Sequence, residues 1–264
     1  MKIENYDFNV ILDKVSNIVL NVKKHLVTNF KIEEKEGAAN IVTSSDIAVQ
    51  EYLIKELKPL IKDASFFCEE GDLKNTNSNF IWVIDPIDGT ENYSRNIPEY
   101  GVSIALAYKK EVVMGVVYNV LKEELYTAIK GEGSFLNNKK LSTSKRDFNH
   151  SLICIAMSVY HKEHKEECNK ILLETFNFCK DYRRFGSAAL ELCYMAKGEI
   201  DLFFEYQLYL WDYYAAALIL KEAGGIIKGY DEEIIFKPTS MVIAANNQEN
   251  FDILNKIVKN NIKR

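Results

Sequence analysis

The sequence predicts an α/β protein of the α+β kind, in which helices pack against groups of sequential strands. The chain has 264 residues, of which 47% are hydrophobic and 27% charged. Such a composition is typical of a globular protein with a large core, arranged as one domain or two lobes. Three segments rich in Val, Ile and Tyr, at 102–108, 112–118 and 125–129, are joined by short polar connections that favour antiparallel pairing. Segments with helical periodicity precede and follow these strands.

The formal net charge of −5 gives no support to a nucleic-acid-binding surface. An anionic substrate would therefore need local metal ions or backbone amides, rather than the overall field, to attract it. The N-terminus carries no apolar segment of the signal-peptide type, and no apolar run is long enough to span a bilayer. We therefore predict a cytoplasmic protein with neither a nucleic-acid nor a membrane partner.

The cysteines are odd in number and widely scattered, and no two of them have the C-x-x-C spacing. This pattern indicates neither a zinc site nor a disulfide framework. We predict buried, reduced thiols. The five residues are Cys68, Cys154, Cys168, Cys179 and Cys193.

The N-terminal part is predicted to contain two helices and a short strand. Apolar residues at helical spacing predict a helix over about 6–30. A second helix over 44–57 has Ser44 or Ser45 as a good N-cap, and the dipole alone would favour a carboxylate at Asp46 in its first turn. A strand at 65–68 leads to Glu69-Glu70-Gly71, and such acidic pairs before glycine are usually solvated turns.

The central stretch is an apolar strand at 80–84 that runs into Asp85, with Asp88 three positions later. Pro86 favours an extended conformation for the residue before it, and Gly89 allows a tight turn that exposes backbone N–H groups. Carboxylates at a strand end suit a hard divalent cation, and free amides suit a phosphate. An Asp-Gly hairpin turn is the alternative. The whole Asp-Pro-Ile-Asp-Gly-Thr run after a buried strand favours a site.

The C-terminal half alternates between helices and strands. Residues 183–189 predict a strand end that leads into a helix, and a strand at 200–204 delivers Glu205. Asp212 opens a helix over 215–223, which the following glycine pair would terminate. The alternative role of Asp212 is that of an N-cap alone, worth about 1 kcal/mol.

Two histidines, His161 and His164, lie three residues apart in a predicted helix over 161–179. Their Lys and Glu neighbours indicate a solvated helix face rather than a metal site. A strand at 241–245 and a helix over 248–258 close the chain.

Five motifs follow one another along the chain: Ile41-Val42-Thr43 with Asp46, Glu69-Glu70, Asp85-Pro86-Ile87-Asp88-Gly89-Thr90, Gly186-Ser187-Ala188-Ala189 with Glu205, and Trp211-Asp212 with Glu222-Ala223-Gly224-Gly225. Together they resemble the inositol monophosphatase family of magnesium-dependent, lithium-sensitive phosphatases, over nearly the whole chain. The resemblance implies a layered αβαβα sandwich of the inositol monophosphatase and fructose-1,6-bisphosphatase type, and a homodimer. Residues 1–145 would form an N-terminal lobe with an antiparallel sheet and the metal-binding motifs. Residues 146–264 would form a C-terminal lobe with a mixed sheet that completes the site.

The resemblance also implies a set of metal ligands. Glu69, Asp85 and the backbone carbonyl of Ile87 would hold a first ion. Asp85, Asp88 and Asp212 would hold a second, and Glu69 would help to place a weaker third. Because all of these ligands are oxygens, they point to Mg²⁺, with Mn²⁺ as a substitute, and away from zinc.

The resemblance assigns catalytic roles to Glu69, Thr90 and Asp46. Thr90, paired with Glu69, would orient and deprotonate the attacking water. The amides of Gly89 and Thr90 would bind the phosphate. Contacts to the rest of the substrate would come from Asp88, Gly186, Ser187, Ala188, Glu205 and Asp212.

Electrostatics independently requires cations if these acids converge. Two unit charges about 4 Å apart near a protein surface repel by roughly 4 kcal/mol. Four carboxylates and a phosphate dianion in one cleft therefore need counter-ions, and two to three divalent ions would neutralise them. Such ions activate a water and stabilise a leaving alkoxide. We expect direct attack by water without a phosphoenzyme.

The function implied is hydrolysis of a small-molecule phosphate ester, a polyol or sugar phosphate such as inositol 1-phosphate. Two catalytic alternatives are a fructose-1,6-bisphosphatase-like activity and removal of the 3'-phosphate of adenosine 3',5'-bisphosphate. The latter is suggested by Arg95-Asn96, which is similar to a pair in the nucleotide-directed branch. A non-catalytic regulatory module is the alternative from another class, since some bacterial relatives associate with the transcription machinery.

Overall fold

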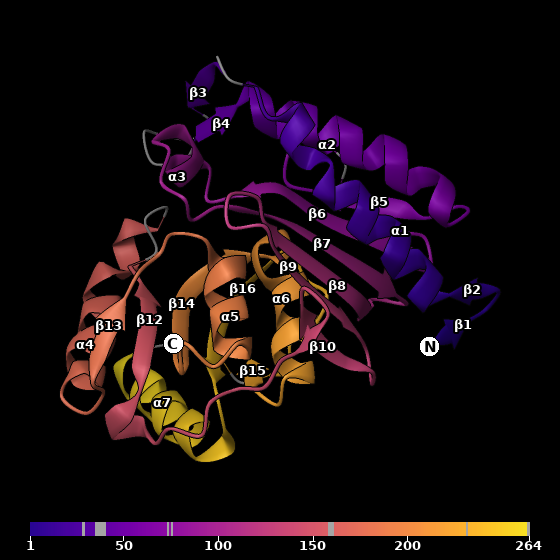
Figure 1. The fold of residues 1–264 in the computed structure, drawn as a ribbon. Helices are drawn as coiled ribbons and strands as arrows, with labels where there is room; N and C mark the ends of the chain where they lie inside the picture. Colours follow the sequence, from indigo (N-terminus) through magenta and orange to yellow (C-terminus); the bar gives the residue numbers. More distant parts are fainter. Residues whose placement is uncertain are drawn as a thin grey trace.

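The computed structural model describes residues 1–27, 30–34, 41–72, 74, 76–157, 161–230 and 232–262. Figure 1 shows five stacked layers: a helix pair, a seven-stranded sheet, a second helix pair, a five-stranded sheet and a third helix pair. Three clusters of buried side chains lie between these layers. The predicted αβαβα sandwich is therefore confirmed.

The seven-stranded sheet has the order β11-β10-β9-β8-β7-β6-β5. Its antiparallel core β7-β8-β9 confirms the pairing predicted from the short connections. The sheet is not purely antiparallel, because β5 pairs with β6 in parallel. Such a pair needs a crossover connection, which residues 69–79 supply. The strands are β5 (Ser65–Cys68), β6 (Phe80–Asp88), β7 (Gly101–Tyr108), β8 (Glu111–Asn119), β9 (Glu124–Ile129), β10 (Gly133–Leu136) and β11 (Lys139–Lys140).

Helices α1 (Phe8–Leu20) and α2 (Ser44–Leu57) cover the outer face of this sheet (Figure 1). Alternate residues of β6, among them Trp82 and Ile84, point into the cluster beneath these helices. Their neighbours Ile81 and Val83 point to the opposite face. Because both faces are covered, β6 is apolar along its length until the two aspartates at its end.

The five-stranded sheet has the order β13-β12-β14-β16-β15 and is mixed. Strand β14 pairs in parallel with β12 and antiparallel with β16. Helices α4 (Lys165–Phe176) and α7 (Gln248–Asn261) cover its outer face. The strands are β12 (Leu152–Ala156), β13 (Asp181–Arg183), β14 (Leu202–Tyr209), β15 (Ile226–Lys228) and β16 (Thr239–Ala245).

The middle layer consists of α5 (Ala188–Ala196) and α6 (Leu210–Glu222), which lie between the two sheets. Since both faces of these helices meet apolar strands, neither shows a clear hydrophobic stripe in the sequence. All nine residues of α5 are buried. As predicted, glycine ends α6: Gly224 adopts φ +93°, and the amide of Gly225 donates to Leu220 O at 3.0 Å.

Several predicted boundaries are wrong. The first helix ends at Leu20 and continues only as a 3-10 turn, and α6 begins at Leu210 rather than near 215. The N-cap of α2 is Thr43, not a serine, because the Asp46 carboxylate folds back onto the Thr43 amide at 2.8 Å. The remaining elements are β1 (Lys2–Ile3), β2 (Tyr6–Asp7), β3 (Ile32–Glu34), β4 (Ile41–Thr43), α3 (Thr90–Ser94) and the 3-10 helices η1 (Val22–His25), η2 (Lys58–Leu60), η3 (Phe148–His150) and η4 (Lys162–His164).

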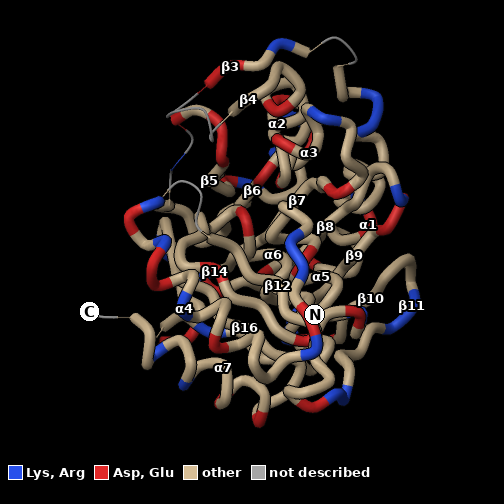
Figure 2. Tube along the Cα trace, turned by 90° about the vertical axis from the view of Figure 1, so that its left-hand side faces the viewer, with Lys and Arg blue, Asp and Glu red and all other residues tan. Residues whose placement is uncertain are grey.

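Among the described residues, no helix is both long and apolar enough to cross a membrane. Basic and acidic segments are interspersed around the outline of the described chain (Figure 2). All five cysteines are free and buried, as the sequence predicts.

Candidate active site

The end of β6 is irregular at the Asp-Pro-Ile-Asp sequence. Asp85 lies opposite Ser103 of β7 and Asp88 lies opposite Gly101, with a register shift between the two pairs. Pro86 has no N–H to give to the sheet, and the amide of Ile87 donates instead to Asp85 Oδ1 at 3.0 Å. The two carboxylates therefore stand at the buried end of the strand, where they are only 2% and 8% exposed.

Gly89 turns the chain away from β6 and into α3. Its φ of +92° lies in the left-handed region, where a side chain is strained. A Cβ atom at this position would also come within 2.9 Å of Glu99 O and 3.2 Å of Gly186 O. The glycine predicted from the motif is therefore required both by its backbone conformation and by the close approach of two other segments.

Thr90 and Asp46 meet beside this turn, although 44 positions separate them in the chain. Thr90 Oγ1 lies 3.1 Å from Asp46 Oδ1 and 3.0 Å from Ile87 O. The other oxygen of Asp46 accepts hydrogen bonds from the Thr43 amide and hydroxyl. Burial raises the pKa of Asp46 to about 6. Asp46 thus completes the capping box of α2, beyond the dipole role expected from the sequence, and also contacts the proposed catalytic threonine.

Four carboxyl groups from three separate segments converge at the end of β6. Burial raises the pKa of Asp85 well above its ordinary value, and the charges of Glu69, Asp88 and Asp212 raise it further. The carboxyl groups of Asp85 and Glu69 share a hydrogen bond. The pKa of Asp212 is also raised, first by burial and then by Asp88 and Glu69. Residues 69, 85, 88 and 212 therefore share one neighbourhood.

The backbone around Glu69 is fixed by the structure rather than solvated. The Glu69 amide donates to Ile84 O at 3.1 Å, which continues the β5–β6 pairing. Gln50 Nε2 donates a hydrogen bond to Glu70 O, and Gln50 Oε1 accepts one from the Glu70 amide. Glu70 is 8% exposed. A solvated turn, the alternative for this acidic pair, is therefore wrong.

Asp212 lies in the first turn of α6. Its Oδ2 accepts a hydrogen bond of 2.8 Å from the Tyr209 amide, which is the capping contact considered from the sequence. The helix start is tied to the seven-stranded sheet by Ser103 Oγ, which donates to Trp211 O at 3.1 Å. Asp212 therefore caps its helix while its charge acts on the β6 carboxylates.

The loop that precedes α5 contacts Asp88 directly. Asp88 Oδ2 accepts hydrogen bonds from the Ser187 hydroxyl and, at 2.8 Å, from the Ala189 amide. Burial raises the pKa of Asp88, and these hydrogen bonds lower it. Burial has the larger effect, so the pKa rises to about 7. Because Ser187 is 1% exposed, its hydroxyl serves Asp88 rather than solvent.

Two residues that the sequence analysis missed hold this loop in place. Glu191 Oε1 accepts from the amides of Phe185 at 2.5 Å and Gly186 at 3.0 Å. The Asn92 side-chain amide donates to Phe185 O and Glu99 O, each at 2.6 Å. An acid in the first turn of a predicted helix was the only available signal for Glu191. Nothing local marks Asn92.

Glu205 lies on β14, on the other side of the loop. Burial raises its pKa to about 8, and the charge of Glu191 adds to this while that of Arg184 opposes it. A bulge follows Glu205 on β14, where the register to β16 shifts before Leu208. The nearby charge of Glu205 also raises the pKa of Asp212, so Glu205 borders the carboxylate cluster.

The two histidines do not join this cluster. His164 stacks on Tyr206 with ring centroids 3.9 Å apart, and its Nδ1 lies 3.2 Å from Glu167. His161 contacts Glu163 at 3.2 Å. In the described ranges, no three His, Cys, Asp or Glu side chains have the spacing of metal ligands.

The donor set nevertheless suits a hard cation. Four carboxyl groups and the Ile87 carbonyl supply only oxygen atoms. Burial, and then mutual repulsion, keeps the pKa values of Asp85 and Asp212 high. Divalent ions between them would remove that repulsion. A cavity of about 530 Å³ lies elsewhere, beside the C-terminal half of α6. The chemistry of the acid cluster, not cavity size, identifies the candidate active site.

The fold and this cluster define a class: a layered α/β protein with an all-oxygen acidic site where β6, α5 and α6 meet. The sequence model of the inositol monophosphatase family matches residues 3–263, and the chain belongs to this family. The chain is 35% identical to Nus factor SuhB of Escherichia coli (strain K12) over 214 residues. These aligned residues make up 80% of this chain and 80% of the relative.

Solved structures agree with this assignment. The extragenic suppressor protein SuhB of Bartonella henselae superposes with a TM-score of 0.87 and 29% identity, over 96% of this chain and 100% of that chain. The inositol monophosphatase of Thermotoga maritima superposes with a TM-score of 0.85 and 27% identity, over 95% of this chain and 97% of that chain. Membership of this family implies phosphatase activity.

Proposed function

We propose that the protein is a Mg²⁺-dependent phosphomonoesterase that acts on a polyol or sugar phosphate, with inositol 1-phosphate as the preferred substrate. The observation that carries this proposal is the convergence of Glu69, Asp85, Asp88 and Asp212 beside the Thr90–Asp46 pair. A protein without bound cations or catalysis would gain nothing from buried acids that repel one another.

The proposed metal ligands are Glu69, Asp85 and Ile87 O for one Mg²⁺, and Asp85, Asp88 and Asp212 for another. Glu69 would help to place a third. When bound, the ions would supply an acidic water and stabilise the charge of the leaving oxygen. The chain's own task is to hold these oxygens in place. Asp88 is fixed by Ser187 and Ala189, and Asp212 by the Tyr209 amide.

The attacking water would be oriented by Thr90 and Glu69. The Thr90 hydroxyl hydrogen points to Asp46 Oδ1 or Ile87 O, which leaves an oxygen lone pair to accept from the water. Asp46, with its pKa near 6, can take up the proton that passes through Thr90 near neutral pH. The sequence analysis paired Thr90 with Glu69 alone. The contact with Asp46 provides Thr90 with a second carboxylate partner, which would accept its proton.

The phosphate would be bound by the amides of Gly89 and Thr90. The organic part of the substrate would lie against Gly186, Ala188 and Glu205, with Asp88 and Asp212 close by. Ser187 would act by positioning Asp88 rather than through a contact of its own hydroxyl. Tyr209 stacks on Trp211 with ring centroids 4.9 Å apart, and would border the same side of the site.

Phosphate release from a substrate panel with Mg²⁺ tests the proposal. The panel contains inositol phosphates, sugar bisphosphates and adenosine 3',5'-bisphosphate, and we expect the highest kcat/KM for inositol 1-phosphate. Mn²⁺ replacement and Li⁺ inhibition are measured on the same panel. A preference of more than about tenfold for the nucleotide, equal to roughly 1.4 kcal/mol of transition-state binding, would replace our substrate assignment.

One observation favours a second candidate function, that of a regulatory module. Several relatives that cover most of this chain bear the name Nus factor SuhB rather than that of a phosphatase. A complete lack of Mg²⁺-dependent phosphate release across the panel, from folded protein, would favour that function. We rank it second because an inert module has no use for the carboxylate cluster.

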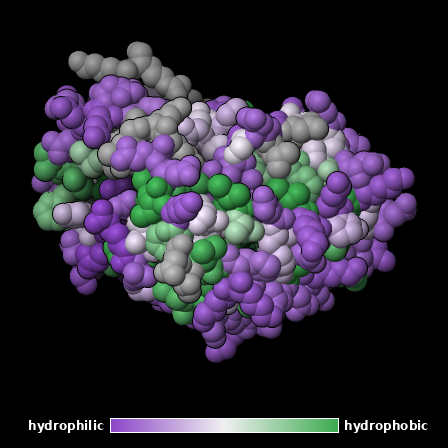
Figure 3. Space-filling model, turned by 90° about the horizontal axis from the view of Figure 1, so that it is seen from above, coloured by the Kyte–Doolittle hydropathy of each residue, from purple (hydrophilic) through white to green (hydrophobic). Residues whose placement is uncertain are grey.

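We also propose that the protein is a cytoplasmic homodimer. Four large apolar side chains are about half exposed at the edge of the five-stranded sheet: Leu173, Phe176, Phe178 and Tyr182. Figure 3 shows hydrophobic surface at the edge of the molecule where Figure 1 draws α4 and β13. Such a patch at a sheet edge is typical of an interaction surface. The buried free thiols support the cytoplasmic location.

Sedimentation equilibrium tests the dimer. We expect a dimer for the wild type and a monomer for Phe176→Glu, because a charge at the centre of an apolar interface would be buried without a partner. Ile47→Glu on α2, whose side chain is equally exposed, is the matched control and should remain dimeric. A monomeric wild type would contradict this proposal and leave the catalytic one intact.

A further inference from the structure

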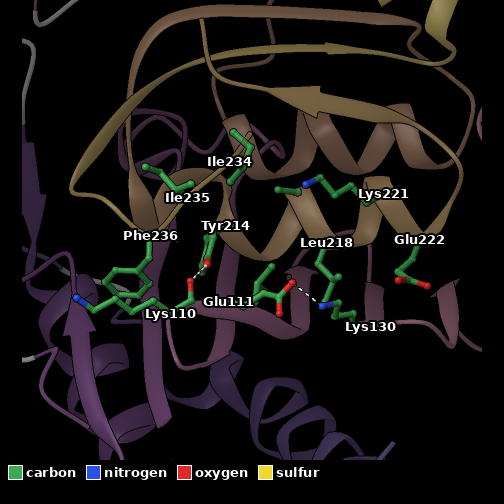
Figure 4. Close-up of a pocket in the computed structure, with 12 residues that line it drawn as sticks. Lys110, Glu111, Lys130, Tyr214, Leu218, Lys221, Glu222, Ile234, Ile235 and Phe236 are labelled. Carbon is green, nitrogen blue, oxygen red and sulfur yellow. Dashed lines mark hydrogen bonds and ion pairs between the residues drawn. The ribbon is translucent and has the colours of Figure 1, made fainter. Parts of the chain in front are cut away.

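A cavity of about 530 Å³ lies apart from the carboxylate cluster. Its walls are the C-terminal half of α6, the residues around the β7–β8 turn and the segment that precedes β16 (Figure 4). This volume is within the range of pockets that bind small molecules. Asp212 and Lys221 are nine residues apart on α6, which corresponds to about 14 Å along the helix axis. None of the residues proposed above for catalysis is among the described residues that line the cavity.

The interior wall of the cavity is apolar. Tyr214 and Leu218 of α6 face Ile234 and Phe236 across it (Figure 4). The rings of Tyr214 and Phe236 meet edge to face with their centroids 5.8 Å apart. The Tyr214 hydroxyl donates a hydrogen bond to Lys110 O at 2.9 Å. Ile235 at the rim is 47% exposed. The wall therefore offers contact to an apolar body but few free hydrogen-bonding groups.

The charged groups at the rim are not balanced. Glu111 is paired with Lys130, and the Glu222 carboxylate accepts from the amides of Gly131 at 2.7 Å and Gly133 at 2.8 Å. Lys221 has only a loose contact of 3.8 Å to Glu233. Within the described part of the chain, the Lys110 ammonium has no carboxylate within ion-pair distance. Positive charge therefore remains available at the mouth of an apolar cavity.

We propose that this cavity is a second binding site, for a small amphipathic anion. The apolar body of the ligand packs against Tyr214, Leu218 and Phe236, and its acidic group lies at Lys110. A wholly polar anion such as inorganic phosphate leaves the apolar wall in contact with water, and a neutral hydrocarbon leaves the free ammonium group unpaired. An amphipathic anion satisfies both.

Fluorescence titration with anilinonaphthalene sulfonate, an aromatic sulfonate, tests the site on the full chain in saturating Mg²⁺ and inorganic phosphate. We expect one bound probe per chain that phosphate does not displace. Lys110→Glu should weaken binding about tenfold, because an attractive contact becomes a repulsive one. Lys109→Glu is the matched control. Its ammonium lies 5.2 Å from the Tyr108 ring, outside the cavity, and it should bind the probe within about twofold of wild type.

A second pair of variants distinguishes the effect of a charge placed at the cavity rim on probe binding from the effect of a change in the protein's net charge. Ile235→Glu places a charge at the rim and should also weaken binding, whereas Ile253→Glu on α7 should not. Circular dichroism checks that each variant keeps the wild-type fold. Equal loss in Lys109→Glu and Lys110→Glu, wild-type binding in Lys110→Glu, or displacement of the probe by phosphate would each overturn the proposal.

Discussion

Asp212→Asn is expected to abolish phosphate release while the fold persists. The asparagine oxygen can still accept the Tyr209 amide, so the cap of α6 is kept. What is lost is the negative charge among the carboxyl groups at the end of β6. Since changes in groups that only support a metal ligand cost about 10–100-fold, loss of a proposed ligand should reduce kcat/KM by more than about 100-fold. Activity assays with increasing Mg²⁺ measure this.

Asp147→Asn is the matched control for this variant. Asp147 is another acid that caps a short helix, and it accepts the His150 amide at 3.0 Å. It is exposed, and it is not among the groups whose charges act on Asp85 or Asp212, so its replacement should leave kcat/KM unchanged. If Asp212→Asn instead lowered the thermal stability and kept full activity per folded molecule, Asp212 would be a helix cap and nothing more.

The metal-free protein is expected to lose stability as the pH rises from about 4 to about 7. Burial raises the pKa values of Asp46 to about 6 and of Asp88 to about 7 in the folded state. In the unfolded chain an aspartate titrates near 3.9. Between these values the folded state binds more protons, so the stabilisation is complete below about pH 4 and is lost as the pH rises through about 6 to 7. Urea unfolding in a chelator measures the trend.

Mg²⁺ should reverse this trend, because it binds the deprotonated carboxylates and competes with protons. At about 100 times its Kd, a single bound ion adds roughly 2.7 kcal/mol to the free energy of unfolding. We expect this gain near pH 8 and a much smaller gain near pH 5. In Asp212→Asn the gain should be reduced, and in Asp147→Asn it should match the wild type. Equal stabilisation at both pH values would contradict a carboxylate metal site.

Elements with local signals were predicted well from the sequence. The apolar run at the start of β6, the alternating strands β7 to β9 and the glycine end of α6 depend on residues a few positions apart. Gly89 could be singled out for the same reason, because its backbone turn is a property of its own position. Boundaries were less accurate where capping decided them, as at Thr43 and Leu210, since several nearby residues compete for each cap.

The contacts that build the candidate site were not available from local patterns. Thr90 meets Asp46 across 44 positions, and Ser187 meets Asp88 across 99. Glu191 and Asn92 hold the loop between them from two different helices, α5 and α3. The sequence by itself determined which strands and helices form, and supplied acids of the right chemistry. Only the packing of the layers decided which of these acids meet, because hydrogen bonds over such separations depend on the three-dimensional arrangement and leave no periodic trace in the chain.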